Sequence, residues 1–332
     1  MKKTQRRNRP TLQDIAREAG VSSATVSYVL NGTGSISPAV QKRVRETARA
    51  IGYRVNHMAR ATRTGQTLSI GLILPDLSNP FFPELAQAVQ SAARDAGYAV
   101  FLVDSEGAIE TEHDSADDLI RRGVEGIVWC PASEHDSLAE FRGDVPIVVV
   151  DRPLPHYDTI SSDHYSGGAL VADQVLALGH RHVALVAGPQ ALSRARQRRQ
   201  GFVERIGDRA TIDWVVENPF AITLSEATQA KLHDNEATVI VCGNDFIALG
   251  VMRALHELGR RVPEDVSVVG FDDILWARHA IPGLATVRQP LTALGKEASA
   301  LLIRRIAGDD APYVNMSLAT EVIVRGSLHE PN

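Results

Sequence analysis

The chain has 332 residues, 44% of them hydrophobic, and a formal net charge of -5. This length and composition fit a folded protein with two or more cores and exclude the disordered and fibrous classes. No apolar run approaches the roughly 18 residues that a membrane span needs. The basic start, MKKTQRRNRP, leads into no apolar segment. We therefore expect a cytoplasmic protein that neither spans a membrane nor is exported.

Cysteines and histidines give no sign of a metal site. Cys130 and Cys242 both lie in apolar, strand-like runs, so buried free thiols are expected rather than a disulfide or a metal pair. The histidines lack zinc-ligand spacing and are expected on the surface or in loops: His113, His135, His156, His164, His180 and His182. The sequence thus predicts neither a metal nor a cofactor.

Charge is distributed unevenly along the chain. Residues 1–65 hold 13 of the 35 Lys and Arg residues and 3 of the 40 Asp and Glu residues, which gives +10 and leaves -15 for residues 66–332. A segment this positive attracts polyanions by counterion release, whereas the acidic remainder is repelled by them. The two parts are therefore expected to face different partners, with a merely solvated charged face as the alternative.

Three short helices are predicted in the basic part, over residues 11–20, 22–32 and 37–52. Thr11 caps the first helix, and Asp14, three residues on, forms a near capping box with it. The apolar residues of all three helices recur at helical spacing. The three helices can therefore enclose one small core and form an all-α headpiece.

The first two helices and the tight turn between them form a helix-turn-helix pattern. In such a motif the second helix lies in the major groove, with its N-terminal residues at the base edges. Here those residues are Ser22, Ser23, Ala24 and Tyr28, whose hydroxyl and methyl groups suit phosphates, bases and thymine methyls. A protein-interaction module of three helices is the alternative, which the strongly basic charge opposes.

The segments TLQDIAREAGVSSATVSYVLNG and ISPAVQKRVRETARAIGYRVNHMARATRTGQT resemble the DNA-binding headpiece and hinge of the lactose-repressor (LacI/GalR) family. The resemblance implies a dimer on a near-palindromic operator of double-stranded DNA, with a headpiece of residues 1–55. It implies a hinge of residues 56–66 that folds in the minor groove when DNA is bound. The DNA-binding residues that it implies are Thr11, Ser22, Ser23, Ala24, Thr25, Ser27, Tyr28, Asn31, Tyr53, Asn56, Met58, Ala59, Arg60, Thr62 and Arg63.

The hinge departs from the family pattern at two positions. Thr62 replaces the leucine that wedges into the central base step, and Val55 replaces a proline. Threonine is a poor apolar wedge. Either Met58, Arg60 and Arg63 take a larger part in the minor groove, or the operator is kinked less.

From Leu68 onward, short β-branched runs alternate with helical stretches. One set of strands is LSIGLIL, AVFLVD, GIVWCP and VPIVVVD, and a second is HVALVAGP, IDWVVEN, ATVIVCG and VSVVGFD. LATVRQP follows, and then a final helix over about residues 290–306. This alternation is typical of parallel α/β sheets. The two sets predict a two-lobed α/β core with a cleft.

Ligands of open α/β sheets bind beyond the carboxyl ends of the strands. The residues there combine carboxylate, amide and guanidinium groups, which take paired hydroxyls, with phenyl rings, which cover C–H faces. The mixture favours a hydroxyl-dense ligand over a phosphate. Singly, Asn244 also fits a helix N-cap, Phe81 and Phe82 fit a core, and Arg198 fits a solvated helix face. The candidate effector residues are Asn79, Phe81, Phe82, Asp151, Arg152, Arg198, Phe220, Asn244, Asp272 and Gln289.

Residues 68–328 are similar to the periplasmic sugar-binding-protein fold that LacI/GalR regulators use, and the candidate residues are similar to its ribose-binding pattern. The resemblance implies an effector-binding and dimerisation domain of residues 67–332. A small sugar is the implied effector, with D-ribose as the best single guess. Another sugar such as allose, a nucleoside or a purine stays open.

Together these features predict a homodimeric, cytoplasmic, nucleoid-associated repressor. Closure of the lobes around the sugar would lower operator affinity by a population shift, although purine-type relatives use their ligand as a corepressor. The end of the chain, GSLHEPN, carries no heptad tail, which favours a dimer over a tetramer.

Two rival functions fit less well. An α/β enzyme would need a catalytic or phosphate-binding motif, and the strand-to-helix turns contain no G-x-G-x-x-G, G-x-x-x-x-G-K-[ST] or G-x-S-x-G. An exported sugar-binding protein is opposed by the basic headpiece and the missing signal peptide. We therefore expect a regulator and not an enzyme.

Overall fold

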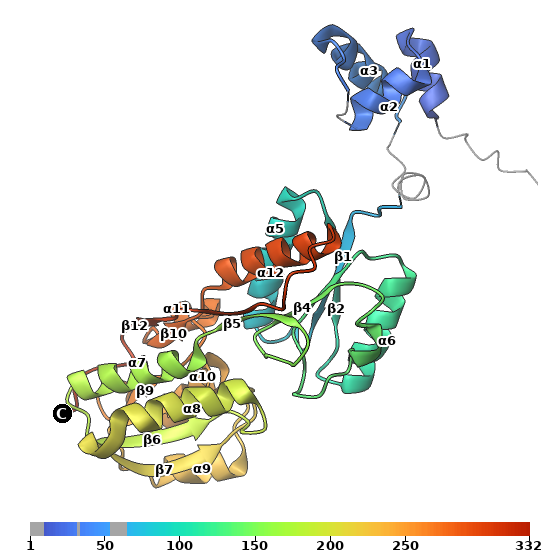
Figure 1. The fold of residues 1–332 in the computed structure, drawn as a ribbon. Helices are drawn as coiled ribbons and strands as arrows, with labels where there is room; N and C mark the ends of the chain where they lie inside the picture. The colour runs from blue at the N-terminus through green and yellow to red at the C-terminus, as the bar shows by residue number, and fades with distance from the viewer. Residues whose placement is uncertain (1–9, 32–33, 54–64) are drawn as a thin grey trace, which may run out of the picture. The chain divides into compact units, whose positions relative to one another are not determined.

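The computed structural model describes residues 10–31, 34–53 and 65–332 and divides into two compact units, Met1–Thr67 and Leu68–Asn332 (Figure 1). The first unit is helical, and the second consists of two α/β lobes built on parallel sheets. The predicted fold class is confirmed. Among the described residues, no helix is long and apolar enough to cross a membrane.

The helical unit contains α1 (Leu12–Ala19), α2 (Ser23–Asn31) and α3 (Pro38–Ala50). The capping box at the start of α1 is present: Asp14 N donates to Thr11 Oγ1 over 3.3 Å, and Thr11 N donates to the Asp14 carboxylate over 2.9 Å. The αL conformation of Gly20, with φ 62°, ends the helix. The shared core holds Ile15, Ala16, Ala19, Val26, Val29, Val44 and Ala48.

The first lobe is built on a six-stranded parallel sheet with the order β11-β5-β4-β3-β1-β2. Its apolar side chains alternate between the two faces: Ile70, Leu72 and Leu74 pack with α5 and α12, and Ile73 packs with α6. Figure 1 shows α5 and α12 side by side on one face and α6 on the other. The strands are β1 (Ser69–Leu74), β2 (Ala99–Asp104), β3 (Ile127–Trp129), β4 (Ile147–Val150), β5 (Asp158–Ser162) and β11 (Asn315–Leu318). The helices are α5 (Phe81–Asp95), α6 (Ile109–Arg121), the 3-10 turn η1 (Ala139–Phe141) and α12 (Leu291–Ile306).

The second lobe has a four-stranded parallel sheet with the order β7-β6-β8-β9, and a short antiparallel pair, β10-β12. Helices α7 and α8 cover one face of the larger sheet, and α9 and α10 cover the other. The strands are β6 (His182–Ala187), β7 (Thr211–Glu217), β8 (Val239–Cys242), β9 (Ser267–Val269), β10 (Thr286–Arg288) and β12 (Glu321–Ile323). The helices are α7 (His164–Ala177), α8 (Ser193–Ile206), η2 (Gly207–Arg209), α9 (Glu226–His233), α10 (Asp245–Glu257) and α11 (Leu275–His279).

Helices α7 and α8 lie in close backbone contact because a glycine of each helix faces the backbone of the other. A Cβ on Gly168 would lie 2.0 Å from the Arg198 carbonyl oxygen, and a Cβ on Gly201 would lie 1.9 Å from the Tyr165 carbonyl oxygen. Any larger residue would push the helices apart. This contact holds the start of α7 next to the N-terminal half of α8.

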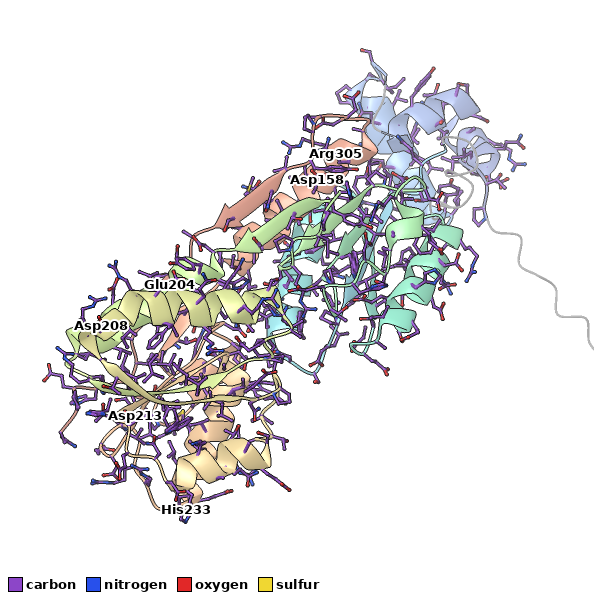
Figure 2. All side chains as sticks on the ribbon, turned by 60° about the horizontal axis from the view of Figure 1, so that its bottom comes forward. Asp158, Glu204, Asp208, Asp213, His233 and Arg305 are labelled. Carbon is purple, nitrogen blue, oxygen red and sulfur yellow. The ribbon has the colours of Figure 1, made fainter. Side chains whose placement is uncertain are left out.

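The chain passes between the lobes from β5 into α7, from β10 into α12 and from β11 into β12. Strands β5, β11 and β12 are absent from the sequence-based prediction because all three are short and because β5 and β11 are at least half polar. Within the first lobe, Arg305 near the end of α12 donates to both carboxylate oxygens of Asp158 at the start of β5 over 2.8 and 2.9 Å (Figure 2).

The two cysteines are free and buried, as predicted. Burial raises the pKa of the Cys130 thiol to about 12, so the thiol stays protonated at neutral pH.

Candidate functional site

A chain of six polar side chains joins the ends of several strands and helices of the α/β unit. Each member is hydrogen-bonded or ion-paired to the next, and all six are less than a tenth exposed. In order, the members are Arg194, Asp151, His164, Arg198, Asp272 and Gln289. We refer to them as the polar chain.

Asp151 is the member that comes from the first lobe. It follows β4 with a positive φ of 73°, which turns its carboxylate towards the second lobe. One carboxylate oxygen pairs with Arg194 of α8, and the other accepts from His164 Nε2 over 2.9 Å. Burial alone would raise the pKa of Asp151, but Arg194, His164 and Arg198 outweigh it and hold that pKa well below its usual range. Asp151 is therefore ionised at neutral pH.

Arg198 lies at the centre of the site, on α8. Its Nε donates to His164 Nδ1 over 3.3 Å, one Nη donates to the Gly243 carbonyl over 2.8 Å, and the other lies 3.1 Å from Asp272 Oδ1. Its guanidinium also stacks on the Phe271 ring, with 3.8 Å between the guanidinium carbon and the ring centroid. These contacts fix the side chain from four directions.

Asp272 and Gln289 are the last two members of the polar chain. Asp272 follows β9 with a φ of 127°, and Gln289 Nε2 donates to its carboxylate over 2.7 Å. Burial raises the pKa of Asp272 to about 6, although Arg198 and Gln289 act in the opposite direction.

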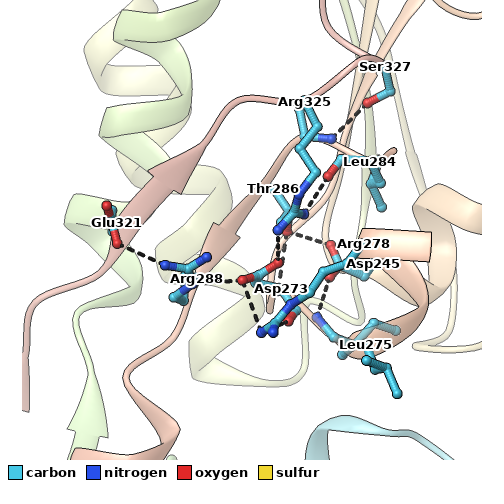
Figure 3. Close-up of polar contacts among 12 residues, drawn as sticks. Asp245, Asp273, Leu275, Arg278, Leu284, Thr286, Arg288, Glu321, Arg325 and Ser327 are labelled. Atoms are coloured by element: carbon cyan, nitrogen blue, oxygen red, sulfur yellow. Dashed lines mark hydrogen bonds and ion pairs between the residues drawn. The ribbon is translucent and has the colours of Figure 1, made fainter. Parts of the chain in front are cut away.

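The turn that carries Asp272 is held by its neighbour, Asp273. The buried Asp273 carboxylate pairs with three arginines from three segments, Arg278, Arg288 and Arg325 (Figure 3). This network fixes the backbone at residue 273. The carboxylate of the preceding residue, Asp272, is therefore held in place by the protein itself.

Among the residues that the structure describes, two buried side chains at this site have polar atoms without a hydrogen-bond partner. Arg152, next to Asp151, is 2% exposed, and its Nε and one Nη make no hydrogen bond. The Oε1 atom of Gln289 is likewise unpaired. Burial, and next to it the charge of Arg194, lowers the pKa of Arg152 to about 10. A buried polar group without a partner lowers the stability of the folded protein. The unpaired atoms of Arg152 and Gln289 are therefore the ones most available to a ligand.

Phe220 adds an aromatic face to the site. Its ring centroid lies 5.1 Å from the Arg194 guanidinium carbon and 5.8 Å from that of Arg198. A Cβ on Gly188 would lie 2.3 Å from this ring. Glycine at position 188 therefore makes room for the ring.

The other predicted effector residues have structural contacts. Asn79 Oδ1 accepts from Phe81 N over 3.1 Å, and Phe81 and Phe82 lie edge to face in the core with centroids 5.1 Å apart. Asn244 caps α10 by accepting from Ile247 N over 3.0 Å. As effector contacts, Asn79, Phe81, Phe82 and Asn244 stay predictions.

His164 and Arg194 are members of the polar chain that the sequence-based candidate set omits. The expectation that His164 lies on the surface or in a loop is wrong, because it belongs to α7 and is 2% exposed, whereas His180 lies in the loop between α7 and β6, as expected, although it is buried. Arg198 is buried too, and not on a solvated face. Arg194 precedes Arg198 by four residues, the spacing that puts two side chains on one helix face. This spacing is the feature of the sequence from which Arg194 could have been added to the candidate residues.

The outer face of α2 is as predicted. Ser23, Ala24 and Tyr28 are exposed, Tyr28 by 50% of its surface. Ser22 Oγ accepts from Thr25 N over 3.1 Å and so caps the helix. Thr25 and Ser27 are partly buried, and Tyr53 packs against the headpiece core.

The predicted hinge contacts lie outside the described residues, as does the side chain of Asn31. These hinge residues are Asn56, Met58, Ala59, Arg60, Thr62 and Arg63.

Comparison with known proteins gives matches over both units. Residues 11–56 match the bacterial regulatory proteins of the lacI family, and residues 172–328 match the periplasmic binding protein-like domain. The ribose operon repressor of Halalkalibacterium halodurans is 32% identical, covering 95% of this chain and 96% of that protein. The transcriptional repressor PurR of Pasteurella multocida is also 32% identical, covering 96% and 98%. The chain belongs to the lacI family.

Solved structures of lacI family regulators agree with this assignment. The lac repressor dimer bound to operator and the anti-inducer ONPF superposes with a TM-score of 0.84 at 27% identity, covering 96% of this chain and 99% of that one. A lacI family regulator from Enterococcus faecalis with bound ribose gives 0.72 at 29% identity, covering 80% and 100%.

Membership in the lacI family confirms the predicted class of function. The chain is a DNA-binding transcriptional repressor and not an enzyme, because its relatives are repressors and regulators. The lacI match spans α1, α2 and α3, the helices predicted to form the headpiece. Among the residues that the structure describes, no group of three acidic, histidine or cysteine side chains could hold a metal ion.

Proposed function

We propose that this lacI family repressor changes its operator affinity when a small sugar, D-ribose in the first place, binds at the polar chain between its lobes. The unpaired atoms of Arg152 and Gln289 carry the proposal, because both lie buried beside charged groups that recognise hydroxyls. A sugar carries several hydroxyls, so one can donate to Gln289 Oε1 and another can accept from Arg152.

The surroundings also suit a sugar. Asp151 and Asp272 supply acceptors on opposite sides of Arg198, and Phe220 and Phe271 supply apolar faces for C–H groups. The ribose operon repressor and the ribose-bound regulator among the relatives favour ribose as the sugar.

A purine or nucleoside is the second candidate, because PurR is as similar to this chain as the ribose operon repressor. The aromatic faces of Phe220 and Phe271 would then stack on a base rather than cover a sugar ring. The ligand test below includes this class for that reason.

On the DNA side, we propose that Ser23, Ala24 and Tyr28 read bases, while residues 56–66 contact the minor groove. Exposure of all three side chains on α2, two of them in its first turn, supports the first assignment. The proposed function places the protein in the cytoplasm, on nucleoid DNA.

We also propose a homodimer, which a near-palindromic operator would require, and the first lobe offers a surface for it. A groove of about 840 Å³ runs between α5 and α12, lined by small side chains such as Ala88, Ala92 and Ala300. The half-exposed Leu275 borders the groove. Small and apolar side chains of this kind allow a helix of a second copy to approach closely.

Calorimetric titration of the full chain with D-ribose, D-allose, adenosine and a purine base tests the effector. Ribose is expected to bind most tightly, and an operator gel shift with and without it then gives the sign of the response. Binding of the purine alone would replace ribose as the effector. Binding of none of the four would refute the proposal.

Deletion of residues 1–65 tests the DNA-binding site and the effector site separately. The truncated chain is expected to lose operator binding and keep its affinity for the sugar, because the α/β unit forms its own cores. Unchanged DNA binding after truncation would show that the headpiece assignment is wrong.

A further inference from the structure

His164 occupies the middle of the polar chain and belongs to no predicted ligand set. It is the first residue of α7, directly after the segment that leaves β5 for the second lobe. Its side chain is 1% exposed, and its ring lies against Phe271 with centroids 5.8 Å apart. A histidine is therefore buried where the two lobes join.

Both ring nitrogens of His164 are engaged by residues of the proposed effector site. Nε2 lies 2.9 Å from Asp151 Oδ1, and Nδ1 lies 3.3 Å from Arg198 Nε. An arginine Nε only donates, so Nδ1 has to accept, and the ring proton has to be on Nε2, which donates to Asp151. The two contacts together fix one neutral tautomer.

The groups around the ring oppose its protonation. A proton on Nδ1 would face the Arg198 donor and break that hydrogen bond. Burial, followed by the charge of Arg198, lowers the pKa of His164, although Asp151 acts in the opposite direction. Arg194 on α8 adds a second positive charge, while Asp272, after β9, is engaged with Arg198. The imidazole is thus held neutral by the charges that face it.

His164 also connects two ion pairs that are otherwise separate. Asp151–Arg194 forms one pair and Arg198–Asp272 the other. Among the side chains that the structure describes, only His164 hydrogen-bonds to both Asp151 and Arg198. Without it, Asp151 would lose a donor and Arg198 would lose its Nε acceptor.

We propose that His164 is a positioning residue of the effector site, a neutral imidazole with its proton on Nε2 that sets Asp151 of one lobe relative to Arg198 of the other. The proposal rests on the proposed function, because it gives His164 a role at the same site. His164 acts through these two side chains and not by contact with the sugar.

The first test is the tautomer, which needs no ligand. Histidine-selective ¹⁵N NMR of the full chain should show one imidazole with a protonated Nε2 and an unprotonated Nδ1 from pH 8 to pH 6. This signal should be missing from the His164→Gln variant, which assigns it. A charged ring at neutral pH, or a proton on Nδ1, would overturn the proposal.

The second test is affinity for D-ribose by calorimetry. His164→Leu removes both hydrogen bonds at similar volume and is expected to weaken binding about tenfold or more, since a buried carboxylate loses a donor. His164→Gln keeps one donor and one acceptor and is expected to restore most of the affinity. The matched control is His182→Leu, which removes the exposed His182–Asp213 pair outside the site.

The outcomes separate the two proposals. Failure of wild-type protein to bind D-ribose or any other ligand of the panel refutes the proposed function, while the NMR result still decides the state of His164. If wild-type protein binds ribose and folded His164→Leu, checked by its thermal unfolding, binds it equally well, the positioning role is refuted. Equal losses in the Leu and Gln variants would also refute it.

Discussion

Glu134 is expected to stabilise, from outside the effector site, the arrangement in which the two lobes contact one another, here called the closed form. It lies in the segment after β3, in the first lobe, and accepts from Arg196 of α8 over 3.0 and 3.1 Å and from the backbone N–H of Ser193. The N-cap residue of α8, Leu192, supplies no side-chain hydrogen bond. The first lobe therefore caps a helix of the second lobe, the helix that carries Arg198.

The size of the effect follows from these two contacts. Loss of a carboxylate N-cap costs about 0.5–2 kcal/mol, and loss of a half-exposed ion pair costs about 0.2–1 kcal/mol. Together Glu134→Ala should cost about 1–2 kcal/mol. Because the contacts exist only while the lobes are together, the cost falls on the closed form and should weaken sugar binding about 5- to 30-fold.

Calorimetry on Glu134→Ala measures this change directly, and thermal unfolding of the same variant checks that it folds. The matched control is Glu257→Ala, which removes a Glu–Arg pair within α10 that does not join the lobes. Control protein should bind the sugar like wild type. Wild-type affinity in Glu134→Ala itself would show that the contact does not contribute to closure.

Three further predictions concern other parts of the molecule. Thr11→Ala removes the capping box of α1 and should destabilise the headpiece by about 1 kcal/mol, measured as roughly fivefold faster amide exchange in α1; unchanged exchange would contradict it. Tyr28→Phe should relax base preference in gel-shift competition with little change in nonspecific affinity, and an unaltered preference would exclude Tyr28 as a reader. The pKa of Asp272 is raised from 3.8 to about 6 in the folded protein, so its ionisation lowers the free energy of unfolding as pH rises across that interval. Asp272→Asn should abolish that part of the pH dependence in denaturant titrations, and an unchanged profile would refute the assignment.

Strand ends were predictable from the sequence because buried parallel strands are apolar runs followed by polar residues. Asp151 follows VPIVVV and Asp272 follows VSVVGF, and both lie in the polar chain. β5, with the sequence DTISS, and β11, with NMSL, were missed. The β5 strand is buried between β4 and β11, and β11 pairs with β5 from far along the chain, which local periodicity does not report.

The same reason explains the two omitted members of the polar chain. Arg194 lies in a basic run and His164 follows a helix-capping aspartate, so each pattern is typical of an exposed helix start. Their burial depends on Asp151, which is 43 and 13 residues away from them. Burial of a charged residue is decided by its partner, and the partner is set by the tertiary fold.

The buried charges of the polar chain are better explained by binding than by stability. Removing ions from water costs several kcal/mol per ion, and apolar pairs of the same size are often at least as stable. The Asp151–Arg194 pair also spans the two lobes, since Asp151 follows β4 and Arg194 lies on α8. A ligand hydroxyl that donates to Asp151 therefore binds a carboxylate that already joins the two lobes. In the proposed function, the Asp151 carboxylate both binds the ligand and contacts the second lobe. Even an uncharged sugar can therefore change the arrangement of the lobes.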